Sequence, residues 1–325
     1  MWRSREERTM PENENNDGVY VSTDQLVALE ANARDLSFVQ KARSHQQLAG
    51  RMQSAMRGRG MAFEELRDYL PGDDIRSIDW RVTARTNKPV VRVYGEEKER
   101  PALIVVDQRI NMFFGSRRAM KSVTSAEAAM LCAWRILGSG DRVGGFAFND
   151  EEIDETKPHR SRNAVIAFAD RIVRQNRSLK ANATHAPAPG QLDTVLERVS
   201  NVAHHDHLVV VISDFEGHTA TTRNLLLQLS GRNDVICILV YDPFLLELPT
   251  SGDIVVSGGA LQAELLLRRA DVRASIDRFA RDRGRELRAW QRELGLPMLP
   301  VSAAEETAPQ LRRLLQQSAW RQRRR

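Results

Sequence analysis

The chain has little cysteine, no long hydrophobic run and no segment of the kind that directs secretion. Cys132 falls in an apolar helical pattern and Cys237 in an apolar strand pattern, so both are predicted to be buried thiols. The longest apolar stretches, LVVVI and VICILV, are far shorter than the roughly 20 residues needed to span a bilayer. The N-terminal stretch MWRSREERTMPENENND has no apolar core or small-residue cleavage site. We therefore expect a cytoplasmic protein without membrane insertion.

Motifs of nucleotide-dependent and covalent catalysis are also missing. The turn GSGD at 138–141 is not followed by the Lys and Ser/Thr pair of a phosphate-binding loop, and no other stretch supplies one. The net charge of +5 is modest but uneven, because arginine dominates from Arg268 to the terminal RQRRR. No aromatic residues are interleaved there for base stacking. This pattern indicates a solvated helix face and a basic tail at 319–325, and nucleic-acid binding is the less favoured reading.

The first hundred residues precede any regular alternation of strands and helices. Residues 1–20 are polar and predicted to be disordered. A helix is predicted from Ser22, since Ser22 and Gln25 have capping-box spacing and the apolar residues that follow share one face. The stretch VVRVY and the Pro-Gly-Asp and Asn-Lys-Pro turns indicate short antiparallel strands. Residues 21–100 are thus expected to form an N-terminal helix and a small accessory β region.

From Pro101 onward the pattern alternates between strands and helices. The predicted strands span 103–106, 143–148, 208–213, 235–241, 254–256 and 298–301. The predicted helices span 121–137, 162–176, 192–203, 219–229, 261–293 and 308–317. Such alternation is typical of an α/β fold with a doubly wound, mostly parallel sheet and helices on both faces. Residues 101–318 are predicted to form this domain.

Two of the predicted strands end in carboxylates. Asp107 closes LIVVD and Asp214 closes VVVISD. Ligands of doubly wound sheets lie beyond the carboxyl ends of the strands, and carboxylate oxygens suit Mg²⁺. The positions two and four residues after Asp107, where small hydroxyl ligands would complete such a site, hold Arg109 and Asn111. A guanidinium about 4 Å from a divalent ion costs roughly 2 kcal/mol even at the dielectric constant of water.

Several motifs together resemble one bacterial family. The run GRGMAFEELRDYLPGDDIRSIDWRVTARTNKPVVRVYGEEKERPALIVVD is followed by FGS, KSV, GDRVGGFAF, VVVISDFEG and VYDPFLLELPTSG. This combination closely resembles the family called domain of unknown function 58, from about Gln25 to Leu315. The resemblance implies a von Willebrand factor A-like fold, a MoxR-type AAA+ ATPase as partner, and client proteins on which the two act.

The resemblance also implies a metal-ion-dependent adhesion site, which is degenerate in this chain. The family's Asp, Ser, Ser pattern falls on Asp107, Arg109 and Asn111, and the expected threonine falls on Gly190. Asp214 matches the remaining acidic position. No metal or cofactor is therefore expected, with Mg²⁺ the less favoured alternative, and Arg109 could pair with either aspartate as a tethered substitute for the metal.

The charged segment before the α/β domain invites a second interpretation. It contains no histidine, cysteine or other nucleophile beside its acids and bases, so a salt-bridge network or a docking face is favoured over an acid/base centre. Trp80 is predicted to be a buried anchor of this network. The residues concerned are Asp73, Asp74, Arg76, Asp79, Trp80, Arg81, Arg85 and Arg92.

These observations favour a non-enzymatic protein-interaction module, an adaptor or cofactor of a MoxR-type ATPase in chaperone-like assembly or maturation of clients. Two alternatives stay open. One is a metal-dependent hydrolase or nuclease that uses Asp107 and Asp214, although a two-metal site normally needs more carboxylates. The other is a nucleic-acid binder that acts through the basic C-terminus, whose signature would be a steep salt dependence.

Overall fold

The computed structural model describes residues 18–36, 61–96, 100–180, 187–245, 253–258, 261–266 and 269–322. The chain divides into two compact units, one formed by Met1–Lys41 with Arg100–Arg325 and the other by Ala42–Glu99. The predicted disorder of residues 1–17 concerns positions outside the described residues, whereas residues 18–20 are described and Tyr20 donates to the Leu179 carbonyl oxygen at 2.8 Å. Of the predicted tail at 319–325, residues 319–322 continue α9 (Thr307–Gln322) and residues 323–325 lie outside the described residues.

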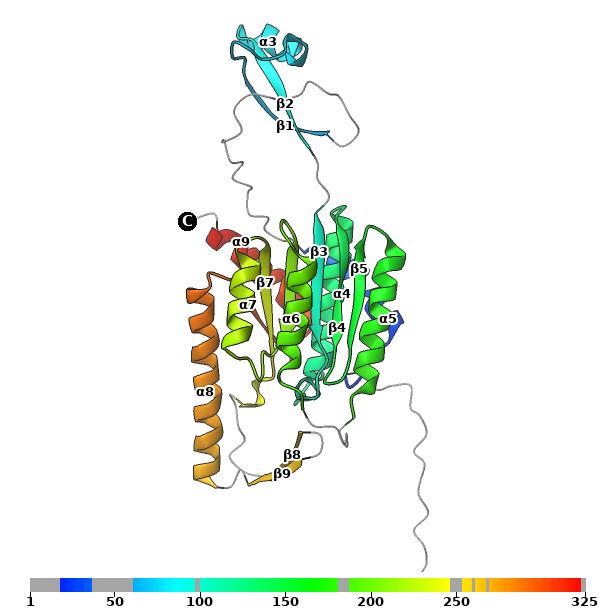
Figure 1. The fold of residues 1–325 in the computed structure, drawn as a ribbon, viewed down its shortest axis with the longest axis vertical. Coiled ribbons are helices and arrows are strands. Elements are labelled where there is room, and N and C mark those ends of the chain that lie inside the picture. The colour runs from blue at the N-terminus through cyan, green and yellow to red at the C-terminus, as the bar shows by residue number, and fades with distance from the viewer. Residues whose placement is uncertain are drawn as a thin grey trace, which may run out of the picture. The chain divides into compact units, whose positions relative to one another are not determined.

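The larger unit is built on a six-stranded sheet of order β10-β7-β6-β3-β4-β5 (Figure 1). Its strands are β3 (Pro101–Asp107), β4 (Arg142–Phe148), β5 (Ile153–His159), β6 (Leu208–Ser213), β7 (Asp234–Tyr241) and β10 (Met298–Ser302). Every neighbouring pair is parallel except β4 and β5, which are antiparallel. The predicted von Willebrand factor A-like, mostly parallel sheet is confirmed.

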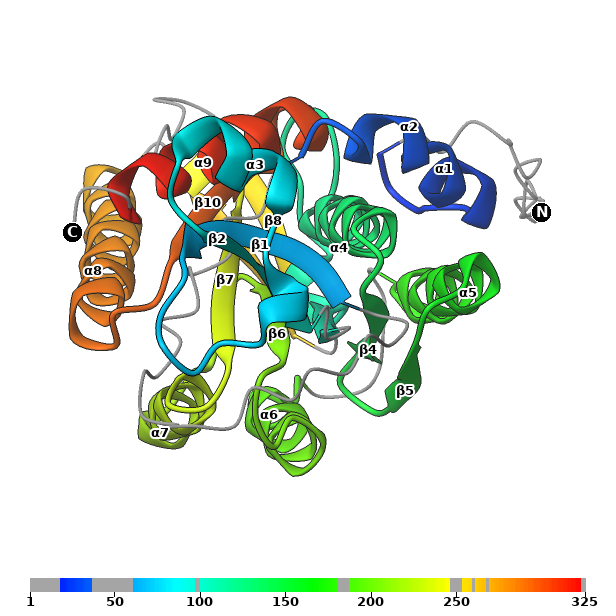
Figure 2. The ribbon, with the colours of Figure 1, turned by 90° about the horizontal axis from the view of Figure 1, so that it is seen from above.

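Helices cover both faces of this sheet, as predicted for a doubly wound fold. One face carries α4 (Lys121–Gly138), α5 (Arg162–Ser178) and α9 (Thr307–Gln322), and the other α6 (Gln191–Val202), α7 (Ala220–Ser230) and α8 (Ala270–Glu293). Figure 2 shows α4 and α5 on one side of the strands and α6 and α7 on the other. Successive side chains of β3 enter opposite cores: Ile104 lies in the first and Val105 in the second. The continuous apolar run of β3 is therefore buried on both faces.

The N-terminal helical segment packs on the α/β unit. It forms α1 (Thr23–Ala28) and α2 (Glu30–Ala33), and Ser22 and Gln25 make the predicted capping box. Leu26 is fully buried, and its carbonyl oxygen accepts a 3.1 Å hydrogen bond from Nε1 of Trp134 on α4. The predicted grouping of residues 21–100 into one accessory region therefore needs correction, because this segment shares a core with α4 and α5.

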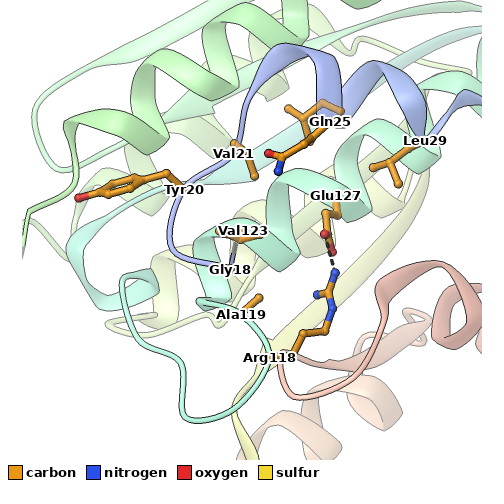
Figure 3. Close-up of a pocket in the computed structure, with 10 residues that line it drawn as sticks. Gly18, Tyr20, Val21, Gln25, Leu29, Arg118, Ala119, Val123 and Glu127 are labelled. Carbon is orange, nitrogen blue, oxygen red and sulfur yellow. Dashed lines mark hydrogen bonds and ion pairs between the residues drawn. The ribbon is translucent and has the colours of Figure 1, made fainter. Parts of the chain in front are cut away.

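A small pocket lies between this segment, α4 and the loop that leads into α4 (Figure 3). It has a volume of about 220 Å³. Apolar atoms of Leu26, Leu29 and Val123 form much of its wall, and Arg118 donates to Glu127 at 2.6 Å within it. Because these two charges pair with each other, the pocket wall presents little uncompensated charge.

Three parts of the secondary-structure prediction were wrong or incomplete. The predicted helix 261–293 begins instead as strand β9 (Leu261–Leu266), which pairs antiparallel with β8 (Asp253–Gly258), and only then continues as α8. The predicted strand 254–256 lies in this separate hairpin and not in the main sheet. Strand β5 was missed, since its polar sequence IDETKPH occupies an exposed edge and carries no apolar alternation. Short apolar runs do not distinguish strand from helix by periodicity alone.

The smaller unit is a two-stranded hairpin with short helical segments. Strands β1 (Met61–Asp68) and β2 (Val90–Glu96) pair antiparallel, as predicted, and the segments between them are η1 (Ile75–Ser77) and α3 (Trp80–Thr86). Val90 and Val91 of β2 are buried. The hairpin and the helix therefore enclose a very small core.

The described residues contain neither a membrane-spanning helix nor a disulfide bond. No helix within them is long and apolar enough to cross a bilayer. Cys132 and Cys237 are free and buried, as predicted, and burial raises the pKa of each thiol to about 12. Both thiols are therefore protonated and unreactive at neutral pH.

Candidate functional site

The carboxylates of Asp107 and Asp214 meet at one edge of the sheet. Asp107 ends β3, Asp214 directly follows β6, and the two strands are parallel neighbours with Val106 opposite Ile212. Asp107 is fully buried and Asp214 is 8% exposed. This is the edge at which doubly wound folds bind ligands, so the predicted pair of acids is brought together where a site belongs.

Arg109 folds back onto Asp107. Arg109 as a whole is 1% exposed, although it follows the strand by only two positions. Nη2 donates to Oδ2 of Asp107 at 2.7 Å and Nε donates to Oδ1 at 3.0 Å, a two-pronged ion pair. The guanidinium also donates to the carbonyl oxygens of Pro189 and Glu216, at 3.3 and 3.2 Å. Arg109 therefore bridges three loops at this edge.

The surroundings keep Arg109 charged. Burial acts to lower the pKa of its guanidinium, but the charge and hydrogen bonds of Asp107 outweigh burial, and the net pKa is raised above the ordinary value. Asp214 and Asp150 act in the same direction. The guanidinium carbon also lies 5.7 Å from the centre of the Phe148 ring, a distance that suits a cation–π contact. A permanent positive charge thus occupies the centre of the site.

Asp214 has its own cation, which the sequence pattern did not reveal. Lys121 Nζ donates to Oδ2 of Asp214 at 2.6 Å, and Asn111 Nδ2 donates to Oδ1 at 2.7 Å. Burial acts to raise the pKa of Asp214, but the Lys121 ammonium outweighs it and the net pKa is lowered. Lys121 is the first residue of α4, where the helix dipole disfavours a cation. A lysine at this unfavourable helix position is the sequence feature that could have pointed to Lys121 as a partner of a nearby carboxylate.

Two further groups tie the loops of the site together. Asp150, which the sequence analysis also missed, accepts hydrogen bonds from the backbone N–H groups of Ile110 and Ala188, at 2.7 and 2.8 Å. Gly190 is the N-cap of α6 and makes no side-chain cap, and a Cβ added there would meet no atom within 4 Å. Arg109 contacts this loop through its hydrogen bond to the Pro189 carbonyl oxygen, and position 190 has room for a side chain.

The donor set does not fit a divalent metal ion. Asp107 accepts hydrogen bonds from Arg109 and, at 2.6 Å, from Ser213 Oγ. Asp214 accepts hydrogen bonds from Lys121 and Asn111. Across the described ranges, no group of three or more His, Cys, Asp or Glu side chains is arranged to hold a metal. The oxygens that a metal would need are already bonded to cationic and neutral donors of the protein itself.

Replacing Lys121 with methionine is expected to lower the free energy of unfolding by about 1–3 kcal/mol at pH 7, because a buried carboxylate loses its charged donor. The folded-state pKa of Asp214 lies below its unfolded value of about 3.9, so its stabilising contribution is complete above about pH 4 and is lost as pH falls through the folded pKa. The difference between wild type and variant should therefore close below pH 4. Urea denaturation between pH 3 and pH 7.5 measures it.

The matched control for this change is Lys180→Met, which removes an exposed lysine charge. It should leave the unfolding free energy within about 0.5 kcal/mol of wild type at every pH, as is usual for surface substitutions. A constant difference between Lys121→Met and wild type from pH 7.5 to pH 3 would show that the ion pair with Asp214 is not its origin.

The charged segment forms a separate set of contacts inside the smaller unit. Arg67 donates to the Asp73 carboxylate through Nη1 and Nη2, at 2.8 and 2.7 Å, and Arg92 Nε donates to Asp79 at 2.8 Å. Both carboxyl groups consequently have a lowered pKa, with the arginine hydrogen bond as the largest cause. Asp74 caps η1 by accepting from the Arg76 N–H. These contacts tie Asp73, Asp74 and Asp79 to their neighbours within the smaller unit.

The predicted burial of Trp80 is wrong. Its side chain is 64% exposed at the first position of α3. A two-stranded hairpin with short helical segments supplies little second layer, and Val90, Val91 and Asp79 are the buried residues of this unit among those whose side chains the structure describes. Arg76, Arg81 and Arg85 are exposed as well, so they do not belong to the predicted salt-bridge network.

Several arginines of the C-terminal region pair with acids where the structure describes their side chains. On α8, Arg281 pairs with Asp277 and Arg285 with Asp282, and Arg223 of α7 donates to Glu293 at 2.9 Å. Local pairing of this kind agrees with the interpretation of a solvated helix face. Residues 323–325 of the basic tail lie outside the described residues.

The solved structures to which this chain is similar include two proteins from Bacteroides. The conserved hypothetical protein BatB from Bacteroides thetaiotaomicron has a TM-score of 0.36 and 11% identity, covering 69% of this chain and 98% of BatB. An aerotolerance-related membrane protein from Bacteroides fragilis, with multiple mutations to serines, has a TM-score of 0.36 and 12% identity, covering 66% and 98%. Similarity at this level supports no conclusion about function.

Sequence comparison finds closer relatives, which are themselves uncharacterized. The uncharacterized proteins Rv1480 of Mycobacterium tuberculosis and Mb1516 of Mycobacterium bovis are each 31% identical over 203 residues. The match spans 61% of this chain and 61% of the length of each relative. The family described as "Protein of unknown function DUF58" matches residues 65–286. That match covers more than half of the chain, includes the charged segment and both aspartates of the site, and shows that this protein belongs to the DUF58 family.

Proposed function

We propose that this protein is a non-enzymatic interaction module that acts in the cytoplasm as an adaptor or cofactor of a MoxR-type AAA+ ATPase, in the chaperone-like assembly or maturation of client proteins. The observation that carries the proposal is the occupation of the ligand-binding edge by the protein's own cations. Arg109 neutralises Asp107 and Lys121 neutralises Asp214, at 2.7 and 2.6 Å. The ATPase as partner follows from the sequence motifs that resemble the MoxR-associated family.

Each carboxylate at this edge is held in a fixed orientation by its donors, which favours a binding platform over a catalyst. A general base or a metal ligand must have a free oxygen in reach of the substrate or the ion. Here Asp107 is fully buried and bonded to Arg109 and Ser213. Burial and bonding of this kind disfavour the alternative of a metal-dependent hydrolase, and the paired arginines on α8 disfavour nucleic-acid binding through that helix.

Co-purification with the ATPase tests the proposal. The full chain, carrying an affinity tag, is expected to retain a MoxR-type ATPase encoded beside its own gene, and to retain more of it with ATP than with ADP or without nucleotide. The reason is that AAA+ ATPases change conformation with the bound nucleotide, so a partner that binds one conformation better senses the nucleotide. The measurement is the amount of ATPase recovered per amount of tagged chain.

An unrelated AAA+ ATPase from the same host serves as the control and should not be retained. If the MoxR-type ATPase is recovered at the level of this control in all three nucleotide conditions, the adaptor proposal is wrong.

A further inference from the structure

Exposed hydrophobic side chains are concentrated in the smaller unit. The exposed large hydrophobic residues among the described ones are Leu66, Leu70, Ile75, Trp80 and Leu227. All but Leu227 belong to the Ala42–Glu99 unit. Single exposed apolar residues are normal, but four of these five belong to one small unit, and the largest of them, Trp80, is 64% exposed.

The exposure of Trp80 is built into a rigid frame. Asp79, the N-cap of α3, accepts from the backbone N–H groups of Arg81 and Val82 at 3.0 and 3.2 Å, and from Arg92 of β2 at 2.8 Å. The backbone N–H of Asp79 also donates to the Val90 carbonyl oxygen at 2.8 Å. The start of α3 is thus fixed to β2 through Asp79, directly before Trp80. A backbone held this way need not be ordered when a partner binds the tryptophan, which lowers the entropic cost of binding.

One face of α3 combines this tryptophan with positive charge. At 100° per residue, Trp80, Arg81, Ala84 and Arg85 occupy a contiguous arc of about 140°, and all of them are exposed. We call these residues the Trp80 surface. Thr83 lies on the opposite face, where its Oγ1 accepts from the N–H of Val90 at 3.1 Å. The helix therefore turns its inner face to the hairpin and its apolar, basic face outward.

The cations of this face have no acidic partner among the described residues. Arg67 and Arg92 pair with Asp73 and Asp79, whereas Arg81 and Arg85 lie in no ion pair with a described residue. Cations that frame an exposed aromatic residue complement an acidic surface with an apolar recess. Trp and Arg are the residue types that most often dominate binding energy at protein interfaces.

We propose that the Trp80 surface docks an acidic protein surface that has an apolar recess for the indole ring. This inference rests on the proposed function, because it assigns that acidic surface to the partner ATPase. A protein partner is favoured over single-stranded nucleic acid, since nucleic-acid platforms stack successive bases on several aromatic side chains, and this face carries a single one, Trp80.

Binding of the full-length chain to the purified, co-encoded MoxR-type ATPase in ATP tests this inference. Trp80→Ala is expected to weaken binding roughly 30-fold or more, as for an interface hot spot. The charge reversal Arg81→Glu with Arg85→Glu should weaken it at least about tenfold and flatten its dependence on salt, because both changes place like charges against the acidic surface. Equilibrium titration at 50 and 300 mM NaCl gives both quantities.

Matched controls lie on exposed positions of the larger unit. Leu227→Ala removes an exposed hydrophobic side chain, and Arg177→Glu with Arg198→Glu reverses two exposed arginines. Both should bind the ATPase within about twofold of wild type, since neither touches the Trp80 surface. All variants change exposed side chains, so circular dichroism and thermal melting should match wild type.

The outcomes separate this inference from the proposed function. Wild type that fails to bind the ATPase overturns both. Wild type that binds, with Trp80→Ala and the charge reversal equal to the controls, overturns the Trp80 surface alone and leaves the adaptor role standing. Loss of single-stranded DNA binding, or of a wild-type dimer, in these variants with ATPase binding intact would assign the surface to nucleic acid or to a second copy, and would also overturn the inference.

Discussion

Arg109→Ala is expected to lower the free energy of unfolding by about 3–5 kcal/mol at neutral pH, the usual cost of removing one partner from a buried ion pair. The side chain is 2% exposed and donates to Asp107 through two nitrogens, so its loss leaves a fully buried carboxylate without a counter-charge. It also frees the carbonyl oxygens of Pro189 and Glu216. Chemical denaturation at pH 7 measures the change.

A double-mutant cycle separates the charge from the packing. Arg109→Met leaves Asp107 unpaired and should cost nearly as much as Arg109→Ala, whereas Arg109→Met combined with Asp107→Asn removes both charges and should recover most of the loss. Arg198→Ala, on the exposed face of α6, is the matched arginine control and should change stability by less than about 0.5 kcal/mol. If Arg109→Ala unfolds like this control, the guanidinium does not hold the site together.

The proximity of Asp107 and Asp214 could be predicted from the sequence, because that proximity depends only on the pattern of the strands. Apolar runs that end in an aspartate specify buried strands, and parallel strands bring their carboxyl ends to one edge. The pairing of Arg109 with Asp107 was foreseen only as one of two options, since the sequence does not determine which carboxylate a flexible side chain reaches. The structure decides it through the loops at Pro189 and Glu216, whose carbonyl oxygens fix the guanidinium.

The features that sequence analysis missed depend on packing between distant segments. Lys121 reaches Asp214 across a separation of 93 residues, and Asp150 ties two loops through backbone N–H groups that carry no sequence signal. Trp80 was predicted to be buried because large aromatic residues usually are, but burial needs a second layer that a hairpin with one helix does not supply. Strand β5 was missed since an exposed edge places few demands on composition.

Restoring small oxygen donors should restore metal binding only if both cations are removed. The variant Arg109→Ser, Asn111→Ser, Lys121→Ala, Gly190→Thr presents three hydroxyl groups beside Asp107 and Asp214, and position 190 has room for the new side chain. In EDTA it should be less stable than wild type, because two neighbouring carboxylates then lack counter-charges. A Mg²⁺ site with a dissociation constant of about 1 mM would add about 1.4 kcal/mol at 10 mM Mg²⁺. That corresponds to a rise in melting temperature of about 3–6 °C.

The same variant with Lys121 retained is the decisive control. Its ammonium lies 2.6 Å from Asp214, and a cation about 4 Å from a divalent ion disfavours binding by roughly 2 kcal/mol at the dielectric constant of water. Thermal melting with 10 mM Mg²⁺ or with EDTA should therefore show no metal-dependent shift for this variant or for wild type. If wild type itself is stabilised by Mg²⁺, the protein's own cations do not replace a metal at this edge. If the variant that keeps Lys121 gains as much from Mg²⁺ as the variant that lacks it, Arg109 alone excludes the ion and Lys121 is only a partner of Asp214.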